Sequence, residues 1–597
     1  MKNFKSLSRL ILLVPLLMTC VPIPVPAQRA DPMAGILVIT GASSEEELDE
    51  QEVERFNHYL SHPLEINLAS RSRLVSSGLL SQYQAASLLD YRSRFGDILS
   101  FSELSAVEGF GPEYVAALKP FLSLESRSLP GATATDSLVI RQDALARVAA
   151  KGEAFSYGTK YKIAVGEYAE ASLAARSYYQ DKSQFPPSSW SANITCYGNK
   201  MLGKAVIGDY NLRVGQGLSL WSGMSLSGLS SSTSFSRRPT GLSPSWSWSG
   251  IGSHRGIAAD FQKGRVSMIA FMSFPGLRYR MEGDNRKEVT LMPGVVLGWL
   301  GKNGQVSFSA WKGSTSGKIS GDFRYNLFGV DLFGETSYDV SSRTTAAVMG
   351  TSILIGEGWR LSGVARSYPG SFDSSFTGSV RSWTKTSDER GVALGLEHYG
   401  AQLTADLAGK YSDRSRRQLK VFLKVPVQIT QEAVLTVRLT ERYRPYEETL
   451  KYKTGGRVDL DWSSAGISAR YGDSDGDAWR ARVRLEGTLC RGLSGLTYYE
   501  FGRKTSKWNT YLRGTLFLVD NWDDRIYSYE RDAPGNFTVP AYYGRGFAFS
   551  VVGGYKFRFM IKKTLRVYLR VSDVAYPLMK DPKPSVWEAK LQAVLAF

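Results

Sequence analysis

The chain has 597 residues, more than one small domain requires, so at least two structural units are expected. Lysine and arginine outnumber aspartate and glutamate by 73 to 56, a formal net charge of +17 that does not by itself indicate nucleic-acid binding. Past the first 27 positions no apolar run is long enough for a transmembrane helix, so a membrane-spanning form of this chain must be a β-barrel. The mean hydropathy of −0.20 does not oppose this form, because barrel strands expose only alternate residues to lipid.

The first 27 residues have the pattern of a secretory signal peptide. Basic residues at Lys2, Lys5 and Arg9 precede an apolar run at 10–18, and small residues end at Ala27. We expect cleavage after Ala27. A lipoprotein signal is the alternative, because Cys20 stands where a lipid could be attached.

Residues 28–43 show no clear pattern and are predicted to be a linker. A helix is expected from Ser44, because Ser44 and Glu47 have the spacing of a capping box. An apolar stripe then continues to Pro63, formed by Leu48, Val53, Phe56, Tyr59 and Leu60. Residues 45–54 are acidic, so the positive excess must lie elsewhere, mostly beyond residue 138.

The stretch 66–124 contains the passages INLAS, LLDYRSRFG, SFSELSAVEGFG and LKPFL. In this order they resemble the competence-type (ComEA-like) helix-hairpin-helix domain. The resemblance implies a small all-α domain over residues 44–125. In that family two helical pairs pack together, and a glycine-containing hairpin joins each pair.

DNA-binding members of that family hold a phosphate with the hairpin N–H groups. The residues that would do so here are Gly109, Phe110 and Gly111, with Arg71, Arg73, Arg92 and Arg94 in support. The acidic residues Glu108 and Glu113 flank this hairpin, and the first hairpin, 77–81, lacks a second glycine. The unit is slightly acidic, whereas a duplex-binding surface needs a basic face. A packing or protein-docking role is therefore favoured over DNA binding.

After a second linker at 126–137, residues 138–597 repeat a period-two pattern separated by turn residues, which predicts about 20 to 24 antiparallel strands closed into a transmembrane barrel. In several strands apolar residues alternate with charged ones, and the charged face must line the lumen. The lumen is thus expected to be basic, and its predicted cations are Lys420, Lys424, Arg480, Arg482, Arg484, Arg566 and Arg570.

The last predicted strand, 585–597, places Trp587, Ala589, Leu591 and Leu595 on one face and polar residues on the other, and ends on Phe597. It resembles the terminal strand of bacterial outer-membrane β-barrels, whose closing phenylalanine is read by the barrel-insertion machinery. The resemblance assigns Trp587, Leu595 and Phe597 to that signal. An edge strand of a soluble β-sandwich is the alternative.

The passages VIGDYNLRVGQG at 206–217 and RGIAA at 255–259 are similar to a group of uncharacterised outer-membrane barrels that carry the same helical unit in front. The segments 222–253 and 520–542 are predicted to be extracellular loops or a lumen constriction. A barrel this wide would leak unless something fills it. These segments or the helical domain are the candidates.

The sequence predicts no catalytic, metal or cofactor site. His58 and His62 are four residues apart but are expected to be a solvated pair, and DSDGD at 473–477 departs from a calcium loop. A barrel enzyme using His254 or His398 is a minor alternative. The two mature cysteines, Cys196 and Cys490, could pair or stay free.

We therefore predict a bacterial outer-membrane barrel with a periplasmic helix-hairpin-helix domain, acting in binding or transport and not as an enzyme. The domain would dock a partner or plug the barrel. Its expected partners are outer-membrane lipid and lipopolysaccharide, the insertion machinery and an unidentified periplasmic protein. The alternatives are a DNA-uptake protein and a barrel enzyme.

Overall fold

The structure, a computed structural model, describes residues 32–48, 50–125, 140–166, 168–181, 185, 187–198, 201–223, 229–248, 252–275, 290–301, 303–356, 358–464, 478–560, 563–579 and 583–596. The predicted signal peptide with Cys20, the linker at 126–137, the turn at 473–477 and Phe597 lie outside the described residues.

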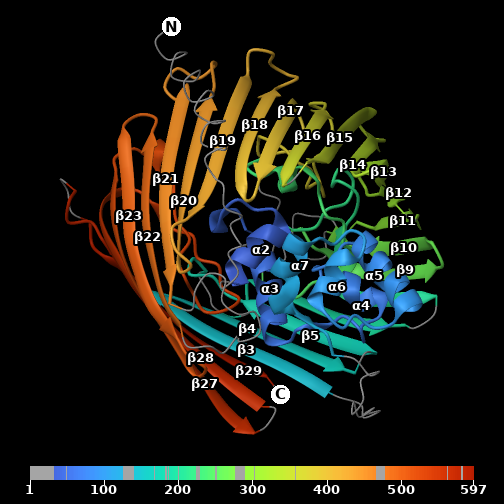
Figure 1. Ribbon diagram of the computed structural model, residues 1–597, viewed down its shortest axis with the longest axis horizontal. Coiled ribbons are helices and arrows are strands. Elements are labelled where there is room, and N and C mark those ends of the chain that lie inside the picture. The colour runs from blue at the N-terminus through green and yellow to red at the C-terminus, as the bar shows by residue number, and fades with distance from the viewer. Residues whose placement is uncertain are drawn as a thin grey trace.

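Within these residues, twenty-four antiparallel strands form one closed barrel (Figure 1), which confirms the predicted fold class. The strands are β3 (Ile140–Lys151), β4 (Ala154–Val165), β5 (Ala169–Arg176), β6 (Ser189–Tyr197), β7 (Leu202–Arg213), β9 (His254–Lys263), β10 (Val266–Ser273), β11 (Met292–Leu300), β12 (Gly304–Lys312), β13 (Gly317–Leu327), β14 (Val330–Asp339), β15 (Thr344–Ile355), β16 (Trp359–Tyr368), β17 (Glu389–His398), β18 (Ala401–Gly409), β19 (Arg417–Gln428), β20 (Ala433–Tyr443), β21 (Tyr452–Ser463), β22 (Ala478–Leu489), β23 (Leu493–Lys504), β24 (Trp508–Val519), β27 (Gly544–Met560), β28 (Lys563–Ala575) and β29 (Val586–Ala596). The last strand, β29, pairs with β3 and closes the cylinder.

The barrel wall has an apolar outside and a polar inside, as the period-two pattern predicts. On β29, Trp587 and Leu591 are 45% and 47% exposed, whereas Gln592 is 1% exposed. On β28, Leu569 is half exposed and the adjacent Arg570 is buried. Because the outward side chains are apolar, the exterior of the barrel suits lipid.

Two chain segments turn into the barrel instead of extending from its rim. The short strand β8 (Gly241–Pro244) pairs with the end of β7, and Trp248 beyond it is fully buried. The hairpin of β25 (Ile526–Tyr527) and β26 (Ala541–Tyr542) lies in the segment 520–542, where Ile526 and Tyr542 are buried. Both segments therefore act as a lumen constriction, which is one of the two roles that the sequence predicts for them.

The N-terminal part of the chain is helical and has its own core. Its elements are α2 (Pro32–Thr40), η1 (Glu45–Glu47), α3 (Glu50–Ser61), α4 (Arg71–Ser76), α5 (Gln82–Phe95), α6 (Phe101–Ala106), α7 (Pro112–Leu118), η2 (Lys119–Phe121) and the parallel pair β1 (Leu64–Glu65) and β2 (Leu122–Ser123). The predicted stripe is confirmed, since Leu48, Val53 and Phe56 are buried in this core. None of the described helices is long and apolar enough to cross a bilayer.

Two local predictions in this region are wrong. The expected linker at 28–43 contains α2, whose residues Ile36 and Ile39 are buried in the core. This short helix is apolar throughout, so it lacks the polar face that an amphipathic pattern requires. The Ser44 side chain makes no cap; the Glu47 carboxylate instead accepts hydrogen bonds from the N–H and Oγ of Ser43, at 2.8 and 2.9 Å.

Candidate functional site

The helical unit, residues 32–48 and 50–125, lies within the ring of barrel strands (Figure 1) and is called the inner domain below. Its ion pairs reach β3, β4, β5 and β7 on one side and β21 and β22 on the other. Contacts to strands so far apart in the barrel place the inner domain inside the lumen. The interface between the inner domain and the lumen wall is the candidate functional site.

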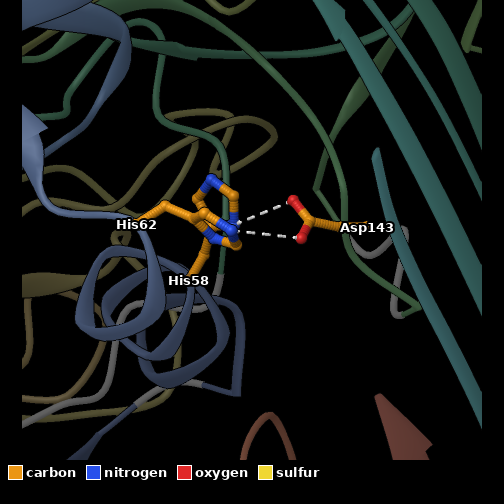
Figure 2. Close-up of side chains that lie close together, drawn as sticks. All are labelled: His58, His62 and Asp143. Carbon is orange, nitrogen blue, oxygen red and sulfur yellow. Dashed lines mark ion pairs between the residues drawn. The ribbon is translucent and has the colours of Figure 1, made fainter. Parts of the chain in front are cut away.

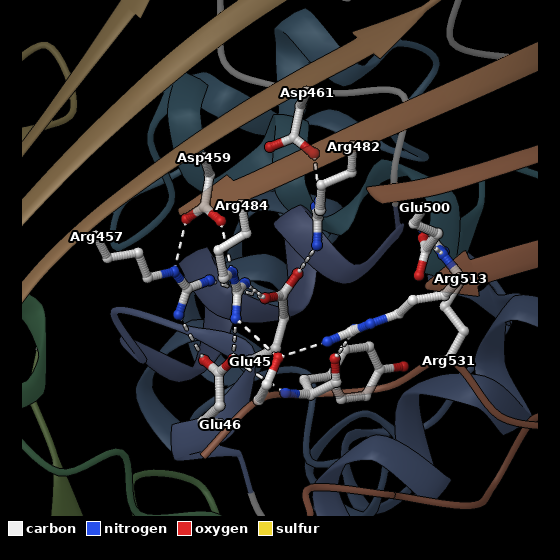
Figure 3. A network of polar contacts seen from close by, with 12 residues as sticks. Glu45, Glu46, Arg457, Asp459, Asp461, Arg482, Arg484, Glu500, Arg513 and Arg531 are labelled. Carbon is white, nitrogen blue, oxygen red and sulfur yellow. Dashed lines mark hydrogen bonds and ion pairs between the residues drawn. The ribbon is translucent and has the colours of Figure 1, made fainter. Parts of the chain in front are cut away.

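Glu45 and Glu46 of the inner domain meet three arginines of β21 and β22 (Figure 3). Glu46 Oε1 lies 2.7 Å from Arg484 Nη1, and its Oε2 lies 3.0 Å from Arg457 Nη1. Glu45 Oε1 accepts a hydrogen bond from Arg482 Nη1 at 2.7 Å. The backbone N–H of Tyr529 also donates to Glu46, at 3.1 Å. These bonds between ionised groups are the stronger kind of hydrogen bond.

The lumen wall holds these arginines in place with its own carboxylates. Asp459 accepts from Arg457 Nε at 2.7 Å and from Arg484 Nε at 2.6 Å. Arg457 and Asp459 are two residues apart on β21, so both side chains point inward. Burial alone would raise the pKa of Glu46, but Arg457 and the Tyr529 N–H outweigh it and lower this pKa to about 2. The pKa of Glu45 is likewise lowered, because Arg482 and Arg457 outweigh its burial.

Helix α3 extends the acidic surface along the lumen. Glu50 pairs with Arg176 at 3.3 Å, and Glu52 pairs with Arg213 at 3.2 Å. The strip formed by Glu45, Glu46, Glu50, Glu52 and Glu54 is called the acidic strip below.

Glu54, the last member of the acidic strip, also forms a buried ion pair. Glu54 Oε2 lies 2.6 Å from Lys160 Nζ, and both side chains are less than a tenth exposed. Burial raises the pKa of Glu54 to about 7, and the adjacent Lys160 only partly offsets this. The carboxyl group therefore titrates near neutral pH.

The predicted lumen cations lie on the inner face of the barrel wall. Arg482 and Arg484 bind the acidic strip, and Lys420 donates to Ser230 Oγ at 3.0 Å. Arg570 pairs with Glu588 at 2.6 Å and with Glu530. The others, Lys424, Arg480 and Arg566, occupy the same inward positions of their strands. Acidic side chains thus balance much of the basic lumen.

The two inward segments fill further parts of the lumen. Asn193 and Ser191 of β6 donate to the backbone carbonyls of Ser245 and Ser247, at 2.6 and 2.9 Å. Asn536 donates to Gln592 of β29 at 3.0 Å. The lumen is therefore occupied by the inner domain and by both segments.

The residues of the predicted phosphate site are not gathered at one surface. Phe110 is buried in the core, and the Gly109 carbonyl accepts from Gln84 Nε2 at 2.8 Å. Arg92 donates to three backbone carbonyls of the inner domain: Ile66, Asn67 and Ala69.

The remaining three arginines point in different directions. Arg73 donates to the Gly166 carbonyl between β4 and β5 at 2.8 Å, and Arg71 is half-buried with Asp260 of β9 nearby. Arg94 is exposed and pairs with Asp90 at 3.0 Å. Gly109 and Gly111 have φ of 83° and 150°, which suits glycine at a tight turn before Pro112 begins α7.

His58 and His62 are not a solvated pair, so that expectation is wrong. They face Asp143 of β3 across the interface (Figure 2), with His58 Nδ1 3.9 Å and His62 Nε2 3.5 Å from its carboxylate oxygens. Both rings are less than a third exposed, because the end of α3 is docked against the lumen wall. Burial lowers the pKa of His58 well below its usual value and also lowers that of His62.

The other two histidines lie against aromatic rings. His254 is buried and stacked on Phe376, with Ser273 Oγ 3.3 Å from its Nδ1. His398 is stacked on Trp359, with ring centres 4.1 Å apart. Cys196 and Cys490 are free thiols.

Sequence reasoning missed the inner-domain half of the site and Arg457, Asp459 and Asp143. The acidic run at 45–54 and the alternating charges of β22 are two signals that complement each other. Taken together, they could have placed the acidic strip in the basic lumen.

No protein-family model matches the sequence, and no curated protein sequence matches it. Among solved structures, the chain is similar to the E. coli P pilus tip assembly intermediate PapC-PapD-PapK-PapG, with 9% identity and a TM-score of 0.41 over 79% of this chain. The match spans 63% of the length of that chain.

Two further matches each cover 77% of this chain. The P pilus usher (PapC) translocation pore is 8% identical over 99% of its own chain, with a TM-score of 0.31. Pseudomonas aeruginosa OccK11 (OpdR) is 8% identical over 94% of its chain, with a TM-score of 0.27.

Proposed function

We propose that this protein is a bacterial outer-membrane transport barrel whose inner domain plugs the lumen. The observation that carries the proposal is the acidic strip, which meets the cations of β4, β5, β7, β21 and β22 inside the cylinder. A barrel of twenty-four strands would be an open aqueous channel if its lumen were not filled.

The apolar exterior supports the membrane assignment. Outward residues such as Trp587, Leu591 and Leu569 are about half exposed, and a closed barrel leaves no unpaired strand edge toward lipid. The outer membrane is the bacterial membrane whose proteins have this architecture. Lipid and lipopolysaccharide are then the surroundings of the barrel, and Trp587, Leu595 and Phe597 would serve its insertion.

The nature of the interface supports a plug that can be released. The buried core of the inner domain is formed by its own residues, and among the described residues Phe537 from the barrel part of the chain packs against it. The interface with the wall is instead rich in ion pairs. A domain with its own core and a polar interface can separate without exposing a large apolar surface. The release would be driven from the periplasm, where a partner protein could engage the inner domain.

Conductance in planar bilayers tests the proposal. The native protein is expected to conduct weakly, and deletion of residues 32–125 should give a large, stable conductance. The double variant Glu45→Gln/Glu46→Gln should open more often than the native protein, because the wall arginines lose the counter-charges that the inner domain supplies and keep only those of the wall. Asp90→Asn is the matched control, since Asp90 is an exposed acid of the same domain whose surface pair contributes little. Equal conductance of the native and deleted proteins would refute the plug.

A further inference from the structure

We propose that His58, His62 and Asp143 form a binding site for a divalent transition-metal ion of the zinc class, which joins the inner domain to the barrel wall. The three residues come from two separate units: His58 in α3 and His62 just after its last residue supply the imidazoles, and β3 supplies the carboxylate (Figure 2). Their candidate ligand atoms all lie within 4.8 Å of one another.

The local backbone explains why both rings reach the same point. His58 and His62 are four residues apart, and the His62 N–H donates to the His58 carbonyl at 2.9 Å, so the helical geometry continues through this turn. Residues at this spacing lie on one face of a helix. Their ring centres are 5.3 Å apart, and both rings face Asp143.

The spacing of the donor atoms fits a metal ion better than a hydrogen bond. The two histidine–carboxylate distances, 3.9 and 3.5 Å, exceed the usual range for a hydrogen bond between nitrogen and oxygen, about 2.7 to 3.2 Å. Ligands about 2 Å from a tetrahedral zinc ion are about 3.3 Å from each other. A small contraction around an ion would therefore satisfy all three groups, with a fourth position left for water.

The surroundings are compatible with a bound cation. The site opens into a cavity of about 150 Å³ that is lined by Glu54, Glu170 and Tyr197 as well as by the three ligands. Lys162, Arg141 and Arg566 are wall cations close to the ligands. Lys162 pairs with Glu170 at 3.2 Å, and Arg141 pairs with Glu65 at 3.1 Å. These carboxylates reduce the repulsion that a metal ion would otherwise meet.

The donor set indicates the class of metal. Two imidazole nitrogens and one carboxylate oxygen are suited to Zn²⁺ and its neighbours in the first transition row, whereas Mg²⁺ and Ca²⁺ prefer oxygen ligands alone.

A bound ion would also help to hold the plug in the lumen, a role that rests on the proposed function. Helix α3 carries Glu50, Glu52 and Glu54, so an ion that fixes the end of α3 to β3 would hold the acidic strip in place.

Zinc titration of the full-length protein in detergent, after metal is stripped with EDTA, tests the site directly. We expect one Zn²⁺ per chain by calorimetry. Substitution of Co²⁺ should give the visible absorption of a tetrahedral site. Each of His58→Gln, His62→Gln and Asp143→Asn should weaken zinc binding at least tenfold. His398→Gln is the matched control, because His398 is stacked on Trp359 and its strand β17 is not a neighbour of β3 in the barrel. This variant should bind zinc like the native protein.

Heat-modifiable gel mobility should show that all variants retain the folded barrel. Unchanged zinc affinity in Asp143→Asn, or no stoichiometric binding by the native protein, would overturn the metal site. Conductance with and without Zn²⁺ separates the two proposals. Zinc should lengthen the closed state of the native protein and not that of Asp143→Asn. Stoichiometric binding without any change in conductance would keep the site and overturn its role in holding the plug.

Discussion

Glu46 Oε1 lies 2.7 Å from Arg484 Nη1, although 438 positions separate the two residues in the chain. Arg484 is 1% exposed and has Asp459 as its second acidic partner. The pair thus joins the start of the inner domain to the middle of a late barrel strand. Because both charges are largely shielded from water, the loss of one leaves the other with fewer opposite charges: Arg484 would keep Asp459, and Glu46 would keep Arg457.

Substitution of Arg484 should weaken the docking of the inner domain more than substitution of an exposed arginine. Arg484→Met removes one of the two arginines that Glu46 and Asp459 share, and both carboxylates keep Arg457. The cost should therefore stay below the about 3 to 5 kcal/mol that is typical when a buried charge loses its only partner. Limited proteolysis of the folded protein should then cleave the inner domain faster. Arg94→Met is the control, because its exposed pair with Asp90 contributes little. Equal cleavage rates in the two variants would contradict the account.

The docking of the inner domain should weaken in acid. The pKa of Glu46 is lowered from 4.5 to about 2, so its contribution is fully present above pH 4.5 and is lost as the pH falls toward 2. A shift of this size corresponds to about 3 kcal/mol. Proteolytic release measured by an acid-stable protease should rise over this window. In the Glu46→Gln variant the inner domain should be released more readily at pH 6, and its release should rise less in acid. A pH profile of release identical to that of the native protein would show that Glu46 does not cause the acid sensitivity.

Glu54 should give docking the opposite dependence on pH. Burial raises its pKa from 4.5 to about 7, so the neutral form is favoured in the docked state. The contribution of the protonated Glu54 carboxyl group to docking is fully present below pH 4.5 and declines as the pH rises through 7. Glu54→Gln should flatten the change in channel closure between pH 5 and 8, as measured by conductance, whereas Glu52→Gln should leave that slope intact. Retention of the native slope in Glu54→Gln would argue against this assignment.

Alternation of side chains was sufficient to predict which face of a strand lines the lumen. Arg482 and Arg484 point inward and Trp587 points outward, as the period of two requires. The partners of these residues could not be derived in the same way, because pairing between Glu46 and Arg484 depends on how a separate domain is seated. Asp143 is likewise 81 residues from His62 in the sequence, and only the closure of β3 against α3 brings them together.

Helix α2 shows a different limit of sequence reasoning. Its nine residues, PMAGILVIT, have no polar face, so they resemble neither an amphipathic helix nor an alternating strand. The helix forms because it packs on α7, where a side chain at Gly35 would place its Cβ 2.9 Å from the Ala117 carbonyl oxygen. Tertiary packing of this kind has no local signature.

A charge placed on the outer face of the last strand should impair the barrel more than a change on its inner face. Leu591 is 47% exposed among outward apolar residues, and an arginine there would face hydrocarbon at a cost of up to about 2 to 4 kcal/mol. Leu591→Arg should therefore reduce the heat-modifiable fraction recovered from outer membranes. Gln592→Ala, one residue away on the lumen face, loses hydrogen bonds to Asn536 and to the Pro534 carbonyl but should still assemble. Normal assembly of Leu591→Arg would contradict a lipid-facing exterior and, with it, the membrane assignment itself.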